Sequence, residues 1–394
     1  MNREIQLGLE KNIAKLNLMS LFTNTQFHQV IFTLFILSKG FSMQQFFIIE
    51  AAGALMALIF QIPTGAFSDR INRKWSLVIG SLINIPIIAI IILSHSFWVV
   101  LVAMALGGLS GAFTSGADSA MLYDTAKAIG QKDNFKKING NFKWYGGLAG
   151  AIGGIVGGIL AQINMSYAWW AYFVASVAVL IVQLTLKNPP KEIEENVNYN
   201  HHVGKSLKLA FKGEAAYFVF FAAITWLFFS LGYWLWQPYL KSIAVPILYF
   251  GIVYAVIDVV SGFVSKHSHK IEKKIGIKSS LLAIPLVLAL SFVLQSTLIA
   301  IFGVLFLLIH SVISGYQGPV LEDYLHSRIP SSNRATVISV KNMINSGLFV
   351  ILSPLLGRMV DLYSLRTTYL LMFGALLIVA VVFGVTFHKV KTNG

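Results

Sequence analysis

Long segments of mostly apolar residues recur along the whole chain, and they constrain its fold more than any other feature. A helix needs about 20 such residues to cross the hydrocarbon core of a membrane. Twelve segments have that character: 17–38, 44–66, 75–95, 97–121, 140–163, 165–186, 214–238, 245–265, 279–295, 297–321, 337–361 and 366–387. Their continuous apolar runs lack the alternating pattern of a membrane β-barrel. The sequence therefore predicts an all-α polytopic membrane protein with twelve transmembrane helices.

The composition agrees with this prediction. Charged residues make up 12% of the chain and hydrophobic residues 56%, whereas soluble domains are about 25% charged. The chain has no cysteine, which excludes disulfide bonds and cysteine metal sites. No small-residue cleavage site follows a short apolar core near the start, so we expect no cleaved signal peptide.

The distribution of Lys and Arg predicts the orientation, because cytoplasmic loops are enriched in both. If the N-terminus is inside, the outer segments hold only four basic residues: Lys39, Lys241, Arg358 and Arg366. We therefore expect both termini to be cytoplasmic. The net charge of +14 is then loop charge that faces anionic lipid headgroups, and nucleic acid is not an expected partner.

The chain also carries a weak internal repeat. The longest polar break, 187–213, separates six predicted helices from six others, which predicts two pseudo-symmetric six-helix bundles, 1–188 and 214–394, joined by a cytoplasmic linker, 189–213. The stretch SGADSAMLYD at 115–124 aligns with SGYQGPVLED at 314–323, so that Asp124 corresponds to Asp323. Such a repeat is typical of transporters that move one half against the other.

A motif between the second and third segments, GAFSDRINRK at 65–74, resembles the signature of the major facilitator superfamily, G-x-x-x-D-R-x-G-R-R/K. The matching residues are Gly65, Asp69, Arg70, Arg73 and Lys74. Asn72 stands where the pattern has Gly, and Asn also tolerates the left-handed backbone that a tight turn requires. The stretch IPTG at 62–65 and the phrase in helix 4 resemble a bacterial branch that contains drug/proton antiporters.

The resemblance implies a cytoplasmic latch. In the family, the motif's Asp and second Arg engage an acid at the inner end of helix 4, which here are Asp69, Arg73 and Asp124, and the Asp also faces the start of helix 11, near Ala335. This network would hold the outward-facing state closed. The alternative is a set of solvated loop charges, which stays open above all for Arg70 and Lys74.

The sequence departs from the antiporter branch at two places. Helix 4 lacks the membrane-embedded Arg of many such antiporters, and the glycine-rich stretch GGLAGAIGGIVGG at 146–158 lacks their Pro. Glycines at four-residue spacing predict close helix contact, with or without a bearing on antiport.

Ionisable groups inside the predicted helices are few, and each costs about 2.5–3.5 kcal/mol on insertion scales. Asp258 and Glu50 are candidates for proton coupling, with a structural hydrogen bond as the alternative. Asp118 lies near the inner boundary and is either a third candidate or a helix cap. His28 and His310 are central in helices 1 and 10, where each either contacts substrate or protons or packs as a neutral ring.

Aromatic residues suggest where an apolar substrate would bind. Trp226 and Phe229 of helix 7 could line a cavity for hydrophobic or cationic compounds, or could face lipid instead. YAWWAY at 167–172 resembles an interfacial belt. The spacing of HSH at 267–269 predicts no metal site, and no cofactor is expected.

Together these features predict a secondary active transporter of a bacterial cytoplasmic membrane that exports a small amphipathic or hydrophobic compound in exchange for protons, as a monomer. Uptake of a small metabolite by proton symport and a receptor without transport remain alternatives. An enzyme is not expected, because no paired acid and base or metal cluster appears at one membrane depth.

Overall fold

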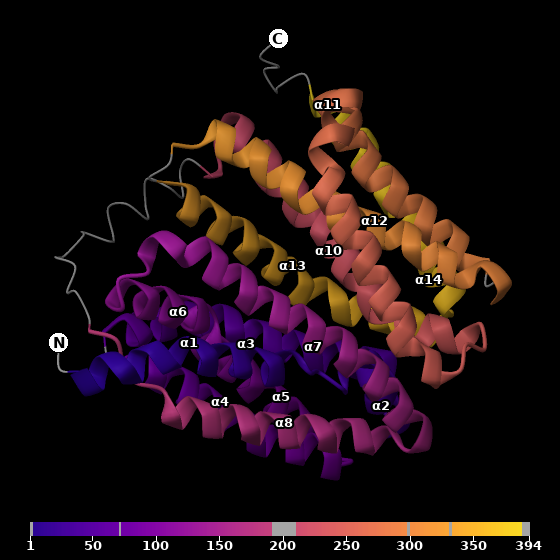
Figure 1. Cartoon of the computed structure of the whole chain (residues 1–394). Helices are drawn as coiled ribbons and strands as arrows, with labels where there is room; N and C mark the ends of the chain where they lie inside the picture. The colour runs from indigo at the N-terminus through magenta and orange to yellow at the C-terminus, as the bar shows by residue number, and fades with distance from the viewer. Residues whose placement is uncertain (1–2, 71, 191–209, 298–299, 331–332, 388–394) are drawn as a thin grey trace. The chain divides into compact units, whose positions relative to one another are not determined.

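The computed structural model describes residues 3–70, 72–190, 210–297, 300–330 and 333–387, and the chain forms only helices and connecting turns in these ranges (Figure 1). Ten helices of this part are long and apolar enough to cross a membrane. The prediction of an all-α polytopic membrane protein is therefore confirmed, with ten to twelve spans according to how interrupted helices are counted.

The chain divides into two compact units. Unit 1 contains the described residues of Met1–Phe41, Ile48–Glu194 and Pro246–Tyr254, and unit 2 those of Ser42–Phe47, Glu195–Val245 and Ala255–Gly394. The boundaries that the sequence predicts for two bundles and a linker stay a prediction. Residues 191–209, most of that linker, lie outside the described part.

The helices that lie wholly or mostly in unit 1 are α1 (Arg3–Asn24), η1 (Gln29–Ile31), α2 (Phe32–Ser38), α3 (Met43–Arg70), α4 (Arg73–Leu93), α5 (Phe97–Thr114), α6 (Ala117–Ala128), η2 (Lys132–Asn134), α7 (Phe135–Ile163), α8 (Met165–Thr185) and η3 (Ile247–Tyr249). Those of unit 2 are α10 (Gly213–Ser242), α11 (Phe250–Ser296), α12 (Ala300–Arg328), α13 (Arg334–Leu362) and α14 (Leu365–Thr386).

The first predicted span, 17–38, is not one helix, which corrects the sequence prediction. Its first part belongs to α1, and its second part forms η1 and α2. Polar side chains explain the interruption: Asn24 Nδ2 donates to the Ser20 carbonyl and Thr25 Oγ1 to the Leu21 carbonyl, each at 2.7–2.8 Å. Asn and Thr side chains that bond the local backbone compete with helix continuation.

The fourth predicted span, 97–121, is also divided. Helix α5 ends at Thr114 and α6 begins at Ala117, because Gly116 between them has a φ of 73°. Glycine adopts this left-handed conformation without the steric penalty that other residues meet. The break places Asp118 in the first turn of α6, where a negative charge favours the helix dipole.

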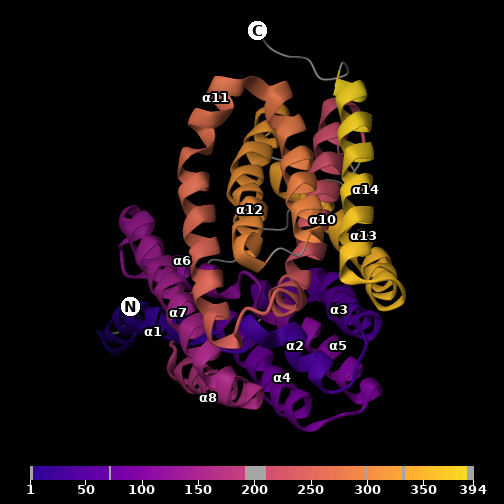
Figure 2. The same cartoon turned by 90° about the vertical axis from the view of Figure 1, so that its right-hand side faces the viewer.

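Helix α11 runs through two predicted spans, 245–265 and 279–295. It contains a non-helical residue, Gly276, with φ 77° and ψ 166°, at which two helices meet. Figure 2 shows the two arms of α11 on either side of this bend. The two predicted segments are therefore the arms of one bent element.

Close packing in unit 1 depends on glycine. A Cβ at Gly108 of α5 would lie against the backbone carbonyl of Gly53 of α3, and a Cβ at Gly157 of α7 against that of Phe27. In both places the backbones approach nearer than any side chain would allow. The close contact predicted for the glycines at four-residue spacing in 146–158 is confirmed at Gly158, where a Cβ would lie 2.8 Å from the carbonyl oxygen of Leu248 in η3.

A core cluster at one end of unit 1 holds α6 in place. Met121 and Leu122 of α6 are fully buried, and they pack with Leu16 of α1, Leu77 of α4 and Val179 of α8. Burial of one face of α6 leaves Asp124 on a less buried face of the same helix. The core therefore fixes where the carboxylate of Asp124 points.

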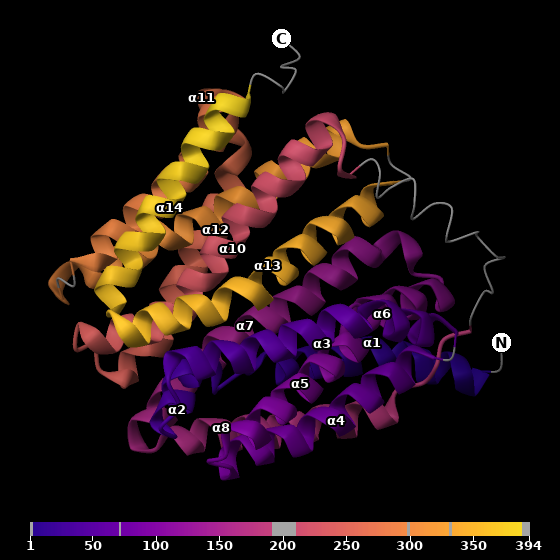
Figure 3. The same cartoon turned by 180° about the vertical axis from the view of Figure 1, so that it is seen from behind.

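In unit 2, α10 packs against α12, α13 and α14, and Figure 3 shows these helices as neighbours. Phe218, Phe221 and Leu235 of α10 are fully buried. The carboxylate of Asp361, near the end of α13, accepts hydrogen bonds from the amides of Met43 and Gln44 at 2.9 and 2.8 Å. A carboxylate on the first free amides of a helix is a favourable cap.

Candidate functional site

The turn that follows α3 is organised by a helix cap. Asn72 has φ 178°, which is extended backbone, and its Oδ1 accepts a hydrogen bond from the Lys74 amide at 2.9 Å. Asn72 therefore does not use the left-handed conformation that asparagine tolerates. Asparagine is favoured here because it caps α4, and this cap sets the direction in which Arg73 leaves the first turn of α4.

Arg73 and Asp124 form an ion pair, with Arg73 Nε 3.3 Å from Asp124 Oδ2. The two side chains are 27% and 34% exposed. The pair joins the start of α4 to α6, two helices separated in the sequence by α5. The structure thus brings together two of the three residues that the resemblance implies for a latch.

The remaining members of the motif are less informative. The side chains of Asp69 and Arg70, at the end of α3, lie outside the described residues, as does that of Ala335. Gly65 has open space where a Cβ would stand, so packing among the described residues does not explain the glycine. The structure describes the Arg73–Asp124 side of the predicted network and leaves its Asp69 side as a prediction.

Lys74 contacts another helix. Its Nζ donates to the carbonyl of Leu184, in the last turn of α8, at 2.7 Å in an exposed hydrogen bond. The bond joins the start of α4 to the end of α8, and a role of Lys74 in the latch stays a prediction.

Asp118 makes a local contact. Its Oδ1 accepts a hydrogen bond from the amide of Ser119 at 2.7 Å, and it lies in the first turn of α6. This geometry is that of a residue near a helix start, the alternative that the sequence left open for Asp118.

Unit 2 contains an ion pair that sequence reasoning missed. Arg328 Nε of α12 donates to Glu214 Oε2 of α10 at 2.8 Å, and the hydroxyl of Tyr324 donates to Glu272 Oε1 at 2.6 Å. Asp323, the repeat mate of Asp124, is exposed and makes no hydrogen bond or ion pair in the described part of the chain. The sequence did hold a signal for this pair: an acidic residue at the start of predicted helix 7 and a basic residue after predicted helix 10, both expected on the same side of the membrane.

The two candidate proton sites have different environments. Glu50 of α3 is partly buried, and its buried Oε1 has no hydrogen-bond partner among the described residues. Asp258 of α11 is exposed on unit 2 and has no partner in the described ranges. Asp258 is therefore not buried within its own unit.

His28 lies in an aromatic box in unit 1. Its ring stacks on Tyr172 with centroids 4.0 Å apart and contacts Trp169 at 4.4 Å, both from α8. The hydroxyl of Tyr172 accepts a hydrogen bond from Asn84 of α4 at 3.3 Å. His28 Nδ1 and Trp169 Nε1 are buried and lack hydrogen-bond partners in the described part of the chain.

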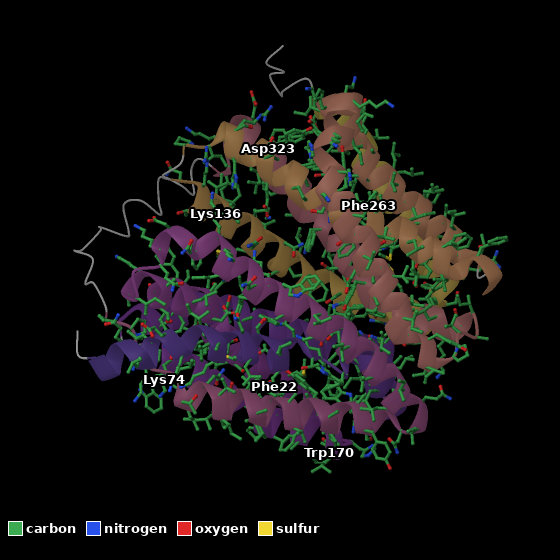
Figure 4. The ribbon with its side chains drawn as sticks, in the orientation of Figure 1. Phe22, Lys74, Lys136, Trp170, Phe263 and Asp323 are labelled. Carbon is green, nitrogen blue, oxygen red and sulfur yellow. The ribbon has the colours of Figure 1, made fainter. Side chains whose placement is uncertain are left out.

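The box removes Trp169 from the interfacial belt that the sequence predicts at 167–172. Trp169 is 1% exposed and part of the core of unit 1. Trp170, its neighbour, is 38% exposed and points away from unit 1 in Figure 4. Adjacent residues of a helix lie about 100° apart, because one turn takes 3.6 residues, so two consecutive tryptophans have different environments.

His310 lies in a second aromatic box, in unit 2. Its ring is fully buried and contacts Phe229 at 4.8 Å, Trp236 at 5.1 Å and Phe292 at 5.4 Å. Neither ring nitrogen has a hydrogen-bond partner of acceptable geometry in the described ranges. Phe229 is thus a core residue rather than a lining residue of an open cavity, whereas Trp226 is 41% exposed.

The described residues contain no group of three or more His, Asp or Glu side chains arranged to hold a metal ion.

Comparison with known proteins gives a consistent result. The family model described as Major Facilitator Superfamily matches residues 16–351. An uncharacterized MFS-type transporter, YxaM of Bacillus subtilis, is 22% identical over 92% of each chain.

Among solved structures, the nucleoside transporter NupG matches 95% of this chain and 99% of its own with a TM-score of 0.84 at 13% identity. A D-xylose-proton symporter matches 95% of this chain and 96% of its own with a TM-score of 0.65 at 13% identity. These two likenesses concern the fold.

Proposed function

Because the chain belongs to the major facilitator superfamily, and is thus a secondary transporter, we propose that it couples protons to the export of a small amphipathic or hydrophobic compound. Glu50 carries the proposal of proton coupling. It is a carboxylate in a membrane-spanning helix, with a buried oxygen that no described residue satisfies. An unpaired carboxylate in apolar surroundings is stable when it carries a proton. Alternating access would let Glu50 take up that proton on one side and release it on the other.

Asp258 is the second residue proposed for proton coupling. It lies in the membrane-spanning part of α11 and is exposed on unit 2. A charged residue on the surface of a membrane helix is rare unless it faces a water-filled path or a partner. Glu50 and Asp258 belong to different units, so the two carboxylates can be tested independently.

The substrate class follows from the scarcity of charge. The spanning helices contain few ionisable groups, and the two buried histidines lie among aromatic rings. Trp226, in predicted helix 7, is exposed on unit 2 and presents an apolar aromatic ring there. Sites of this composition favour neutral or cationic compounds with apolar or aromatic parts.

The ion pair of Arg73 and Asp124 supports a latch in the transport cycle. We propose that it stabilises one conformational state and separates in the other, with Asp69 as the third member. At 3.3 Å and about a third exposed, the pair is weak enough to open during each cycle, since exposed pairs contribute about 0–1 kcal/mol.

Both termini are proposed to be cytoplasmic. The absence of cysteine makes the test direct, because a single cysteine can be introduced by Lys136→Cys or Lys241→Cys. A membrane-impermeant maleimide should label Lys241→Cys in intact cells and Lys136→Cys only after the membrane is opened. The reverse pattern would invert the topology.

The transport proposal is tested with purified protein in proteoliposomes that contain a pH-sensitive dye. A panel of hydrophobic cations, neutral aromatic compounds, nucleosides and sugars is added with an imposed pH gradient. Movement of protons opposite to the compound supports exchange. Glu50→Gln and Asp258→Asn should each be compared with Asp323→Asn, a carboxylate at the predicted cytoplasmic end of a helix; proton coupling that survives both test variants would exclude these residues.

A second candidate function is uptake of a small metabolite together with protons. Two solved structures of similar fold favour it, since one is a nucleoside transporter and the other a D-xylose-proton symporter. In the same assay, symport moves protons in the direction of a nucleoside or sugar, so the sign of the dye response separates the two functions.

A further inference from the structure

Three lysines from separate segments of unit 1 converge on the end of α8. Lys74 Nζ, from the start of α4, donates to the carbonyl of Leu184 at 2.7 Å, and Lys15 Nζ, from α1, donates to the carbonyl of Thr185 at 2.7 Å. These carbonyls belong to consecutive residues, so the two ammonium groups are neighbours. Figure 4 shows Lys74 at the end of unit 1 where α1 begins.

Lys187 completes the cluster. Its backbone is held from both sides by the amide of Asn12: Asn12 Nδ2 donates to the Lys187 carbonyl at 2.7 Å, and the Lys187 amide donates to Asn12 Oδ1 at 3.0 Å. Its aliphatic stem lies against Gly8 of α1. The charges of Lys15 and Lys187 are close enough to act on the ammonium of Lys74. Unlike ordinary surface lysines, these three are therefore positioned by specific backbone contacts.

The positive charge of this cluster has no counter-charge among the residues that the structure describes. No carboxylate of the described residues pairs with Lys15, Lys74 or Lys187. The end of α8 contributes a negative dipole equivalent to about half an elementary charge, less than the three ammonium charges. Each ammonium has three N–H donors, so donors remain after the carbonyl contacts of Lys15 and Lys74. The cluster is thus suited to bind an anion.

The surroundings indicate which anion. Trp75, next to Lys74, is 47% exposed, and Leu184 is 50% exposed; the Lys74 ammonium lies 6.0 Å from the centre of the Trp75 ring. Tryptophan at the end of a spanning helix is typical of the headgroup level of a membrane. A phosphate diester with attached acyl chains matches both the fixed ammonium groups and the apolar edge beside them.

We propose that Lys15, Lys74 and Lys187 form a binding site for the headgroup of an anionic phospholipid, with Trp75 and Leu184 in contact with its acyl chains. The bound lipid would hold together α1, α4 and the segment that leaves α8 toward the linker. Since Lys74 follows Arg73 in the sequence, the lipid would contact the same first turn of α4 that carries the ion pair of Arg73 and Asp124.

The test is native mass spectrometry of the full-length protein with phosphatidylglycerol or phosphatidylcholine of identical acyl chains. The wild-type protein should retain phosphatidylglycerol selectively. The triple variant Lys15→Gln, Lys74→Gln, Lys187→Gln should lose about tenfold or more in that retention, since each lysine near an anionic lipid contributes several-fold. The matched control is Lys136→Gln with Lys137→Gln, two exposed lysines of α7 in the same unit.

The single variant Lys187→Gln separates a loss of lipid binding from a folding defect. The contacts that hold this residue to Asn12 use its backbone, so they stay intact in the variant. It should weaken retention of phosphatidylglycerol about fivefold and leave thermal stability in lipid-free detergent unchanged. Glycerol phosphate in excess should not displace the lipid.

Equal retention of the two lipids by the wild-type protein would overturn the proposal, as would full retention by the triple variant or an equal loss in the control. Complete displacement by glycerol phosphate would assign the site to a soluble phosphate compound instead.

Discussion

Two ion pairs, one in each unit, differ in how firmly the fold holds them. Arg73 and Asp124 in unit 1 are 3.3 Å apart and 27% and 34% exposed. Arg328 and Glu214 in unit 2 are 2.8 Å apart and 19% and 23% exposed. The Arg328 guanidinium also lies 4.7 Å from the centre of the Phe218 ring. A pair that must open in each cycle has to be weak, whereas one that only supports the fold can be strong.

The surroundings sharpen this difference. Arg328 donates to the carbonyl of Tyr324 as well, and the Tyr324 hydroxyl donates to Glu272. Several contacts therefore hold α10, α11 and α12 together. We infer that the unit 1 pair acts in transport and the unit 2 pair in stability, and the following predictions test that division.

The largest expected effect is that of Asp124→Asn on transport. Loss of the carboxylate removes one partner of Arg73, and a change of about 1 kcal/mol, the upper end for an exposed pair, shifts the ratio of two conformations about fivefold. Transport in proteoliposomes should fall by up to about fivefold, while the melting temperature in detergent changes little because an exposed pair contributes little to the fold.

The control is Asp323→Asn, the exposed carboxylate at the corresponding repeat position. It should transport at the wild-type rate. Wild-type transport rates in both variants would contradict the latch hypothesis. Equal losses of transport in both variants would mean that charge at this membrane face, rather than the specific pair, is needed.

Arg328→Ala should have the opposite profile. It removes the ion pair with Glu214 and the contact with Phe218, so we expect the free energy of unfolding to fall by about 1–3 kcal/mol. Transport per folded molecule should be retained. Thermal unfolding in detergent measures the first effect and proteoliposome transport the second.

Arg328→Lys refines the result. Lysine keeps the charge but lacks the planar guanidinium that packs on an aromatic ring, so its stability should fall between those of the wild type and Arg328→Ala. A stable Arg328→Ala protein that no longer transports would reverse the assignment of the two pairs.

The contrast between the pairs also shows what the sequence could predict. The spans were predictable from hydropathy, and the Arg73–Asp124 pair was predictable only as what the resemblance to a known family implies. The Arg328–Glu214 pair was not, since it joins residues more than a hundred positions apart that share no motif. Trp169 was misassigned for a related reason: only the rotation of α8 against α1 decides which of two adjacent tryptophans is buried.

Helix interruptions were equally hard to predict. Apolar composition continues across Gly116 and across the stretch that follows Asn24, so a hydropathy profile shows one span in each case. The breaks depend on a left-handed glycine and on side-chain bonds from Asn24 and Thr25 to the backbone. These contacts become visible only when the backbone path is known.

Tyr324→Phe should have a smaller effect than Arg328→Ala. It removes one hydroxyl, which donates to Glu272 at 2.6 Å, and keeps the ring that packs on Phe218 at 5.5 Å. A hydrogen bond to a charged group is worth about 1.5–3 kcal/mol, but a partly exposed carboxylate regains water, so we expect about 1 kcal/mol. Thermal unfolding checks this, and an unchanged midpoint would remove Tyr324 from the supporting network.

The smallest effects are expected at the two buried histidines, which extend the comparison of the units to their cores. His28 and His310 each contact three aromatic rings. His28→Phe and His310→Phe keep a flat ring in each box and remove no hydrogen bond of the described structure from His28 Nδ1 or from His310. Each should change the free energy of unfolding by less than about 1.5 kcal/mol, measured by thermal unfolding in detergent.

Transport separates packing from function at these positions. If both rings only pack, both variants transport at the wild-type rate and with the wild-type dependence on pH. A folded variant with lost transport, or with a flattened pH profile, would give that histidine a direct role in binding substrate or protons. Because the boxes belong to different units, a defect in one variant alone would also show which unit contributes the ring that the substrate or proton meets.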